Sequence, residues 1–319
     1  MKIENRMKKI SFVLISFILQ VSIANCQNNS KEFDVLRGPY IGQTPPGNQS
    51  KIFAPGFIST ELGELNSVFT ADRKEFYFSR RGIHEKLSAI MVTRMINDEW
   101  TKPEPVNFSG NNDDIDLFIT PDGNSMIFCS GKVRNKNGRA FIDHDFWVSK
   151  RNGGRWGEPV KFAEEVRSEF EDYFPIVTQN DNLYFNSQRG GPGTNDIYCS
   201  RYINGKYSPA EKLSGPINSE FREFDAFVSG DEKMIIFSSD RPGGYGGSDI
   251  YISFKKSDNS WSEPVNLGSD INSSFSEYGA TISPDGKYFF FTSGRNGNED
   301  IFWVSAKFVK EINLKENKR

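Results

Sequence analysis

The sequence contains few of the residues on which many catalytic and metal sites depend. Among its 319 residues there are 2 His and 3 Cys. Two imidazoles cannot supply a three-histidine metal site, and they leave little capacity for general-base chemistry. Three cysteines cannot build the disulfide framework of a small secreted domain. The composition therefore favours binding over catalysis, and it predicts no metal and no cofactor.

A net charge of one sign is also lacking. Lys and Arg number 39 and Asp and Glu number 42, which gives a formal net charge of -3. The charges are spread along the chain, so there is no basic stripe that could follow a nucleic-acid backbone. Nucleic acid is not expected as a partner. With 36% apolar and 14% aromatic residues, the chain is expected to fold rather than to be disordered.

One long hydrophobic stretch is present, and it lies near the N-terminus. Residues 10–23 are apolar apart from Ser and Gln, and they follow a segment with four basic residues. Fourteen residues are too few to span a bilayer, and a basic segment followed by a short apolar one is typical of an export signal. We therefore predict a signal peptide over residues 1–26.

The end of this signal permits two interpretations. The sequence Ser-Ile-Ala-Asn-Cys at 22–26 allows cleavage after Ala24, or it is a degenerate lipobox in which Cys26 is acylated. Asn25 departs from the small residue that usually precedes a lipid-bearing cysteine. Cys26 is thus a lipidation candidate, and such an anchor is the only membrane contact that the sequence predicts. The alternative is that Cys26 is discarded with the signal.

The rest of the chain is built from a repeat. Five short polar turns recur, and each is followed by an aromatic-rich segment that favours a β-strand. Next come a polar loop and a third strand that begins with Asp-Ile-Tyr or a variant of it, and then a Trp or Tyr that announces a fourth strand. The turns lie at 71–73, 121–123, 180–182, 230–232 and 284–286.

The repeat has the length of a propeller blade. An acidic residue opens each unit, and successive acids are 50, 58, 51 and 54 residues apart. A period of roughly 40 to 55 residues with four strands per unit is typical of a β-propeller. The opening acids are Glu64, Asp114, Asp172, Glu223 and Glu277.

The repeat resembles the WD40-like "Pro-Asp" repeat of TolB-type propellers. The matching sequence motifs are Ser-Pro-Asp-Gly-Lys at 283–287, the Ser-x-Arg ending of the second strand and Asp-Ile-Tyr at 249–251. This resemblance covers residues 52 to about 305. It implies an all-β propeller exported to the periplasm or outer membrane of a bacterium. It says little about function, because such propellers serve as interaction platforms, enzyme side domains and occasionally enzymes.

The two ends of the repeat region predict how the ring closes. The fifth unit lacks a fourth strand, whereas residues 51–59 resemble a segment that precedes a unit. We therefore predict that the N-terminal strand completes the last of five four-stranded blades in a propeller over 51–319. A six-bladed alternative requires strands within 33–50, where two Pro and two Gly argue against them. Residues 27–50 are predicted to be a linker.

Each opening acid is predicted to pair with the basic residue that ends the second strand. Positions equidistant from a hairpin turn face one another, and the midpoint of every pair falls on its turn. Because the first strand of a blade lines the channel, the pairs would surround one mouth of it. They are Glu64 with Arg81, Asp114 with Lys132, Asp172 with Arg189, Glu223 with Arg241 and Glu277 with Arg295.

Two interpretations of these pairs stay open. A feature that recurs in every blade is usually architecture, with each base bound to its own acid. A mouth lined by both charges could also receive a sugar, a carboxylate, a basic peptide or a cation. Departures from the repeat add His84 and Tyr245, in loops of the same face, as ligand-binding candidates. His144 could converge with His84, although lone loop histidines are more often solvated.

The sequence thus favours a non-catalytic binding or scaffold propeller that recognises an envelope protein or a glycan at one face. No Gly-x-Ser-x-Gly motif is present, and no catalytic residue is assigned. The alternative is a glycan-active hydrolase or lyase, because a glycosidase needs only two carboxylates on opposite sides of a sugar. Such an enzyme needs an unpaired acid with a raised pKa in a cleft, whereas a platform has paired acids and an open face.

Overall fold

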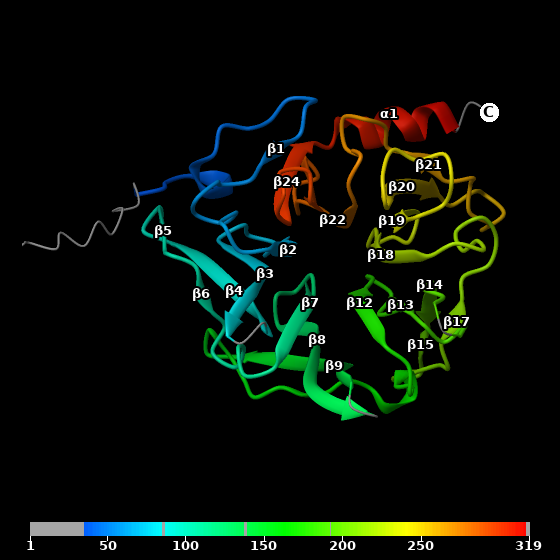
Figure 1. The fold of residues 1–319 in the computed structure, drawn as a ribbon, viewed down its shortest axis with the longest axis horizontal. Helices are drawn as coiled ribbons and strands as arrows, with labels where there is room; N and C mark the ends of the chain where they lie inside the picture. The colour runs from blue at the N-terminus through cyan, green and yellow to red at the C-terminus, as the bar shows by residue number, and fades with distance from the viewer. Residues whose placement is uncertain (1–34, 85–86, 137–138, 192, 317–319) are drawn as a thin grey trace, which may run out of the picture. The chain divides into compact units, whose positions relative to one another are not determined.

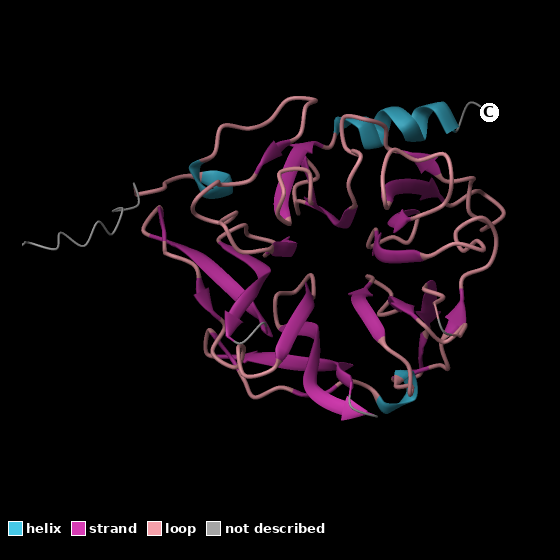
Figure 2. Cartoon of the chain, in the orientation of Figure 1, coloured by secondary structure: helices cyan, strands magenta, loops and turns pink. Residues whose placement is uncertain are grey.

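The computed structural model describes residues 35–84, 87–136, 139–191 and 193–316. The predicted signal peptide and Cys26 lie outside the described residues. Antiparallel sheets succeed one another around a ring, and the first strand of each sheet lies nearest the centre (Figures 1 and 2). This is the predicted five-bladed β-propeller. No helix in the described part of the chain is long and apolar enough to cross a membrane.

Blades 1 and 2 share an outer arrangement in which the third strand pairs with two short strands. The first short strand carries the Trp of the repeat, and the second short strand is the fourth strand of the blade. Blade 1 contains β2 (Glu64–Phe69), β3 (Glu75–His84), β4 (Leu87–Ile96), β5 (Glu99–Trp100) and β6 (Glu104–Pro105). Blade 2 contains β7 (Asp113–Ile119), β8 (Ser125–Lys136), β9 (Arg139–Asn152), β10 (Arg155–Trp156) and β11 (Val160–Lys161).

Blades 3 to 5 are four-stranded sheets. Blade 3 contains β12 (Asp172–Val177), β13 (Leu183–Ser187), β14 (Asp196–Ser200) and β17 (Glu211–Lys212), with the short pair β15 (Tyr202–Ile203) and β16 (Lys206–Tyr207) beside it and η2 (Glu164–Val166) before it. Blade 4 contains β18 (Glu223–Val228), β19 (Met234–Ser239), β20 (Asp249–Phe254) and β21 (Val265–Asn266). Blade 5 contains β22 (Glu277–Ile282), β23 (Tyr288–Ser293), β24 (Asp300–Ser305) and β1 (Lys51–Ile52).

Every innermost strand carries a bulge at the second residue after its opening acid. The residue there has a positive φ, and the pairing register with the second strand shifts beside it. A bulge bends the strand and leaves the extra residue unpaired with the neighbouring strand. At Gly279, where φ is +62°, a Cβ would lie 2.4 Å from Asn66 Oδ1, so a larger residue would be strained and would displace the Asn66 side chain. The bulge residues are Asn66, Asp116, Phe174, Asp225 and Gly279.

The ring is closed by the N-terminal strand, as predicted. β1 pairs with β24, and Lys51 lies opposite Trp303. The next residue, Phe53, is fully buried, and its ring lies 5.0 Å from Phe76 of blade 1 and 5.1 Å from Phe290 of blade 5. The closure therefore joins the first and last blades through one aromatic cluster as well as through strand pairing.

Residues 35–50, expected to be a linker, are instead packed on the propeller. The short 3-10 helix η1 (Pro39–Gly42) buries Tyr40 and Ile41 in the same aromatic cluster. The Tyr40 hydroxyl donates a hydrogen bond of 2.6 Å to Asp285. At the other end of the chain, helix α1 (Lys307–Glu316) packs Phe308 and its neighbours against blade 5. A Pro- and Gly-rich composition excluded strands here, but it did not exclude packing.

We predict that Phe53→Ala lowers the free energy of unfolding by about 3–5 kcal/mol, because a fully buried ring would leave a cavity between two blades. The matched control is Phe275→Ala, since Phe275 is 48% exposed and its loss should change stability by less than about 0.5 kcal/mol. Chemical denaturation of both variants measures the difference. Equal midpoints would show that closure does not depend on this cluster.

Candidate functional site at the channel mouth

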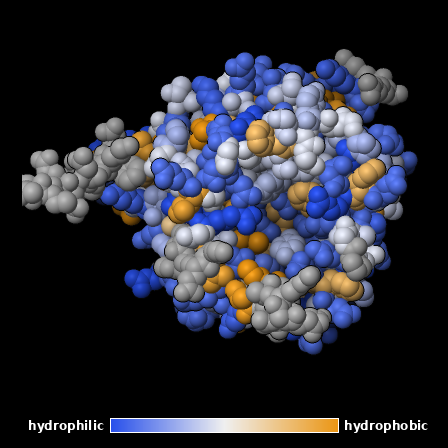
Figure 3. Space-filling model, in the orientation of Figure 1, coloured by the Kyte–Doolittle hydropathy of each residue, from blue (hydrophilic) through white to orange (hydrophobic). Residues whose placement is uncertain are grey.

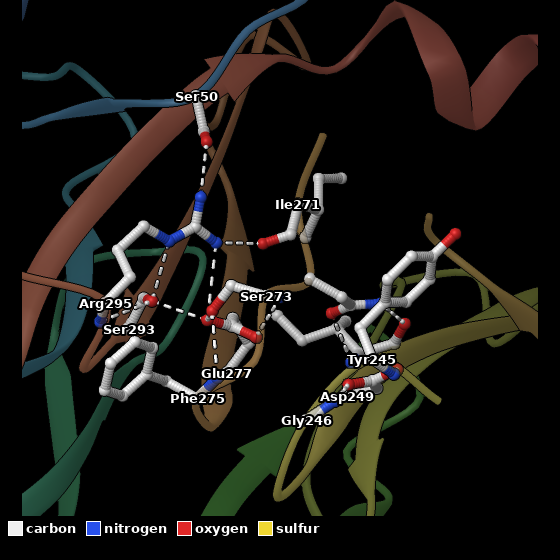
Figure 4. A network of polar contacts seen from close by, with 12 residues as sticks. Ser50, Tyr245, Gly246, Asp249, Ile271, Ser273, Phe275, Glu277, Ser293 and Arg295 are labelled. Carbon is white, nitrogen blue, oxygen red and sulfur yellow. Dashed lines mark hydrogen bonds and ion pairs between the residues drawn. The ribbon is translucent and has the colours of Figure 1, made fainter. Parts of the chain in front are cut away.

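Three of the five predicted acid–base pairs form. Arg189 lies 2.8 Å from Asp172, Arg241 lies 3.0 Å from Glu223, and Arg295 lies 3.3 Å from Glu277. Each guanidinium also donates to a backbone carbonyl of the loop before the acid, as Arg241 does to Ile217 at 2.8 Å. Figure 4 shows this network in blade 5, where Ser293 also binds Glu277.

The predicted pair of Glu64 and Arg81 is wrong. Glu64 is bound by Arg80 at 2.7 Å, and Arg80 lies directly opposite it in the β2–β3 register. In blades 3 to 5 the pairing base stands two residues beyond the position opposite the acid, so both side chains are on one face. Arg81 is only one residue beyond, which reverses its face. It therefore pairs with Glu299 of blade 5, at 2.6 Å.

The predicted pair of Asp114 and Lys132 is also wrong. Asp114 accepts hydrogen bonds from the hydroxyls of Ser109 and Ser130 and from the N–H of Gly110. Strand β8 continues to Lys136 instead of turning into a loop, and this carries Lys132 along the hairpin to an exposed position opposite Asp143. Where the repeat has a polar loop after the second strand, residues 131–136 and 139–144 thus extend the β8–β9 hairpin.

The opening acids lie inside the blades and not on the channel surface. Glu64, Glu223 and Glu277 are fully buried, and Asp114 and Asp172 are nearly so. The Glu223 carboxylate accepts hydrogen bonds from both the N–H and the hydroxyl of Ser219, four residues earlier. This geometry supports the architectural interpretation of the acids. Their role as ligand-binding residues stays a prediction.

A funnel of about 500 Å³ opens at the channel mouth. It is lined by the residue that follows each opening acid, because neighbours in a strand point to opposite faces. Amides, hydroxyls and charged residues surround these side chains, including Asn186, Asn195 and Ser248. The five residues that follow the acids are Leu65, Ile115, Tyr173, Phe224 and Tyr278.

Two buried carboxyls of the bulge residues also line the funnel. Asp116 and Asp225 are 6% and 9% exposed, and Asp116 accepts a hydrogen bond from the Asn66 amide. Burial raises the pKa of Asp116 to about 6. Burial raises the pKa of Asp225 well above its ordinary value, and the charge of Asp116 raises it further. Neither acid was assigned to the channel mouth from the sequence, because counting residues from the hairpin turn does not reveal where a strand contains a bulge.

The rim of the funnel consists of ion pairs that are already formed. Arg81 pairs with Glu299, and Glu299 also accepts a hydrogen bond from the Tyr278 hydroxyl. Burial raises the pKa of Tyr278, so this hydroxyl keeps its proton. Arg222 pairs with Asp240 at 2.7 Å. The charges of the rim are therefore largely neutralised within the protein.

His144 differs from what the sequence suggested. His144 is buried, with Nε2 3.0 Å from Asp113 and its ring 5.2 Å from that of Tyr173. Burial acts to raise the pKa of Asp113, but hydrogen bonds from His144 and Ser88 lower it overall. His84 ends β3, and its side chain lies outside the described part of the structure. His144 is therefore a structural neighbour of the funnel and not a solvated loop residue.

Tyr245 is 51% exposed, and its role as a ligand-binding residue stays a prediction. Its N–H donates a hydrogen bond of 2.7 Å to Asp249, the first residue of a third strand, which fixes the Gly-rich loop (Figure 4). The corresponding acids Asp145 and Asp196 pair with lysines of their own blades. Among the residues that the structure describes, no three His, Cys, Asp or Glu side chains are grouped so that they could hold a metal ion.

The comparisons with known proteins support the architecture. No protein-family model and no curated protein sequence matches the chain. A solved glycoside hydrolase matches with a TM-score of 0.55 at 10% identity, over 83% of this chain and 92% of that one. The chain is a five-bladed β-propeller. An endo-arabinase from Bacteroides thetaiotaomicron matches this propeller with a TM-score of 0.50 at 15% identity, over 82% and 96% of the two chains.

A further structure, of a protein provisionally assigned as TolB from Agrobacterium tumefaciens, matches with a TM-score of 0.46 at 18% identity, over 73% of this chain and 71% of that chain. At these identities the likeness is one of fold. Within the propeller, the Pro-Asp-Gly motif at 284–286 lies between β22 and β23, and the Asp-Ile-Tyr motif at 249–251 begins β20. The repeat seen in the sequence therefore corresponds to the repeat of the blades.

We predict that Glu223→Gln lowers the free energy of unfolding by about 2–4 kcal/mol, because it removes the buried charge that Arg241 neutralises. The control is Glu220→Gln, an exposed acid in the same loop, which should change stability by less than about 0.5 kcal/mol. Thermal or urea unfolding measures both. A Glu223→Gln variant as stable as the control would contradict the architectural role.

We predict that Asp116→Asn stabilises the protein at pH 7 by about 1–3 kcal/mol. The folded-state pKa of Asp116 is raised from 3.8 to about 6, so ionisation costs folding free energy as the pH rises from about 4 to 6. The amide avoids this cost. Unfolding curves at several pH values should show no difference between the variant and the parent near pH 4 and a constant difference above pH 6. A difference that is independent of pH would show that ionisation of Asp116 is not involved.

Proposed function

We propose that this propeller is a non-catalytic binding protein of the bacterial envelope that recognises a glycan at its channel mouth. The observation that carries the proposal is the composition of the funnel. Its walls present the aromatic residues Tyr173, Phe224 and Tyr278 next to the amides of Asn186 and Asn195. A pocket with aromatic faces and a few fixed polar groups suits a ligand that has both C–H faces and hydroxyls, as a sugar ring does.

The charges of the funnel favour a neutral, hydroxyl-rich ligand. Arg81 and Arg222 are each committed to a carboxylate of the rim, so an anionic ligand would have to break an existing pair. Burial raises the pKa of Asp225 well above its ordinary value, which disfavours its charged form and so weakens the attraction for a cation. Hydrogen bonding to hydroxyls requires neither change. Figure 3 shows one face of the ring, which is mostly hydrophilic with separate hydrophobic patches.

The envelope location rests on the predicted signal over residues 1–26, which lies outside the described residues. The sequence therefore supports a receptor or scaffold that presents its funnel to the envelope. An envelope protein as the partner, which the sequence also allows, becomes an outcome of the test below.

A second function is favoured by one observation. Asp116 and Asp225 are buried acids with raised pKa values in the same funnel, and a general acid in glycoside hydrolysis needs a raised pKa. Such a pair would suit a glycan-active hydrolase. The two functions differ in the fate of the ligand, which is released unchanged by a binding protein and cleaved by an enzyme.

The test uses the protein expressed with its own N-terminus, applied to a glycan array and to extracted envelope proteins. We expect binding of a glycan that Phe224→Ala weakens about tenfold or more, since the change removes one wall of the funnel. Phe170→Ala is the matched control, because Phe170 is 39% exposed and lies outside the funnel lining. Its binding should equal that of the parent.

Three results would overturn the proposal. Capture of an envelope protein without any glycan would assign the face to a protein partner. Equal binding by both Phe variants would place the glycan outside the funnel. Release of new reducing ends by the parent protein, lost in Asp225→Asn, would assign the hydrolase function instead.

A further inference from the structure

In blades 3 to 5 an arginine fills the same internal space. Its guanidinium lies over two aromatic rings that face each other on the second and third strands, and it binds the opening acid. In blade 4 the Arg241 Cζ is 5.2 Å from the ring centroid of Phe237 and 5.1 Å from that of Tyr251. Its Nη2 is 3.0 Å from Glu223. The protein thus contains three copies of a guanidinium site, occupied by its own side chains.

Blade 2 has the walls of this site but not the arginine. Phe128 lies opposite Trp147 in the strand register, as Phe237 lies opposite Tyr251 in blade 4. Asp114 stands at the place of Glu223 and is hydrogen-bonded by Ser130, as Glu223 is by Ser239. A cavity of about 330 Å³ lies between these four residues of blade 2. We call it the blade-2 pocket.

The loop that leads into blade 2 explains why the pocket is open. In blade 4 six positions separate Leu213 from Ser219, and this loop supplies the Ile217 carbonyl that Arg241 binds. In blade 2 the N–H that binds the acid in the same way belongs to Gly110, and the equivalent step, from Val106 to Gly110, is four positions. Phe108 in this shorter loop stacks on Phe128, with ring centroids 5.0 Å apart, and takes part of the freed space. The remaining cavity borders Asp114 and Trp147.

The lining of the blade-2 pocket is suited to a cation. Asp114 and Glu158 are acidic, three residues are aromatic and three are asparagines, and no Lys or Arg belongs to the lining. Lys161 lies near the Trp147 ring but is paired with Asp145 at 2.6 Å. The described donors to Asp114 are two hydroxyls and one backbone N–H, all uncharged. A buried carboxylate beside aromatic faces attracts a positive group.

We propose that the blade-2 pocket binds a guanidinium group supplied by a ligand, either free arginine or an arginine side chain of a peptide. The guanidinium would bind the Asp114 carboxylate and stack on Trp147, as the protein's own arginines bind in blades 3 to 5. A planar, weakly hydrated guanidinium stacks on aromatic faces and forms fork-shaped hydrogen bonds with a carboxylate. An ammonium group matches these walls less well. This site is separate from the funnel and does not depend on the proposed glycan.

The experiment is calorimetric titration of the protein, expressed with its own N-terminus, with five probes. These are free arginine, N-acetyl-arginine amide, a short arginine-containing peptide, and the lysine and citrulline counterparts of the capped probe. We expect the arginine probes to bind, the lysine probe to bind more weakly, and the neutral citrulline probe to show no binding. Binding of free arginine alone would identify an amino-acid ligand, and binding of the capped probe and peptide would identify an arginine side chain.

Two variants test the site itself. Asp114→Asn should weaken arginine binding about tenfold or more. Asp172→Asn is the matched control. Arg189 fills the corresponding space in blade 3, so removing the Asp172 charge should leave binding of the arginine probes unchanged. Ser130→Arg places a guanidinium directly opposite the acid, as Arg80 is placed in blade 1, so it should abolish binding and raise the melting temperature.

The proposal is overturned if citrulline and arginine probes bind equally, if no arginine probe binds at millimolar concentration, or if the Ser130→Arg protein remains folded and still binds arginine. If Asp114→Asn fails to fold, the Ser130→Arg result decides, since that change supplies the missing partner of a buried acid instead of removing the acid.

Discussion

Each blade depends on one buried carboxylate. The acid that opens the first strand has almost no contact with water, and its own blade supplies the donors around it, from the preceding loop and from the second strand. A buried charge is tolerated only when it is paired and hydrogen-bonded. The acid therefore fixes the loop, the hairpin and, in four blades, an arginine in one arrangement. It also turns the following residue toward the channel, and this is how the funnel acquires its walls.

The number of blades and the order of their main strands could be predicted because turn residues and aromatic segments recur at a nearly constant spacing. Ring closure could be predicted because the last unit lacks an outer strand and the N-terminal segment supplies one. The channel-facing residues could not be predicted by counting from the turns. A one-residue offset reverses the face of a strand, which is why Arg81 reaches Glu299 instead of Glu64. The bulge that brings Asp116 and Asp225 into the funnel has no signature in the turn.

Blade 2 shows why departures from a repeat need a structure to interpret them. Where the repeat has a polar loop after the second strand, blade 2 extends the hairpin of β8 and β9 and buries His144 against Asp113. Its Lys132 suggested the usual pair, but the same extension carries Lys132 away. The two departures have one cause, a second strand that does not end where its counterparts end. As a result, blade 2 keeps the acid and the facing aromatic rings that surround an arginine in blades 3 to 5, but it has no arginine between them.

The closure of the ring also constrains the order of events during synthesis. β1 is the first strand in the described part of the chain and β24 the last, and they pair with each other. The fifth blade therefore cannot be completed while the ribosome is still making the preceding units, and the aromatic cluster around Phe53 must wait for Phe290 and Trp303. Until β24 has been made, the chain is an open series of blades with an unpaired edge.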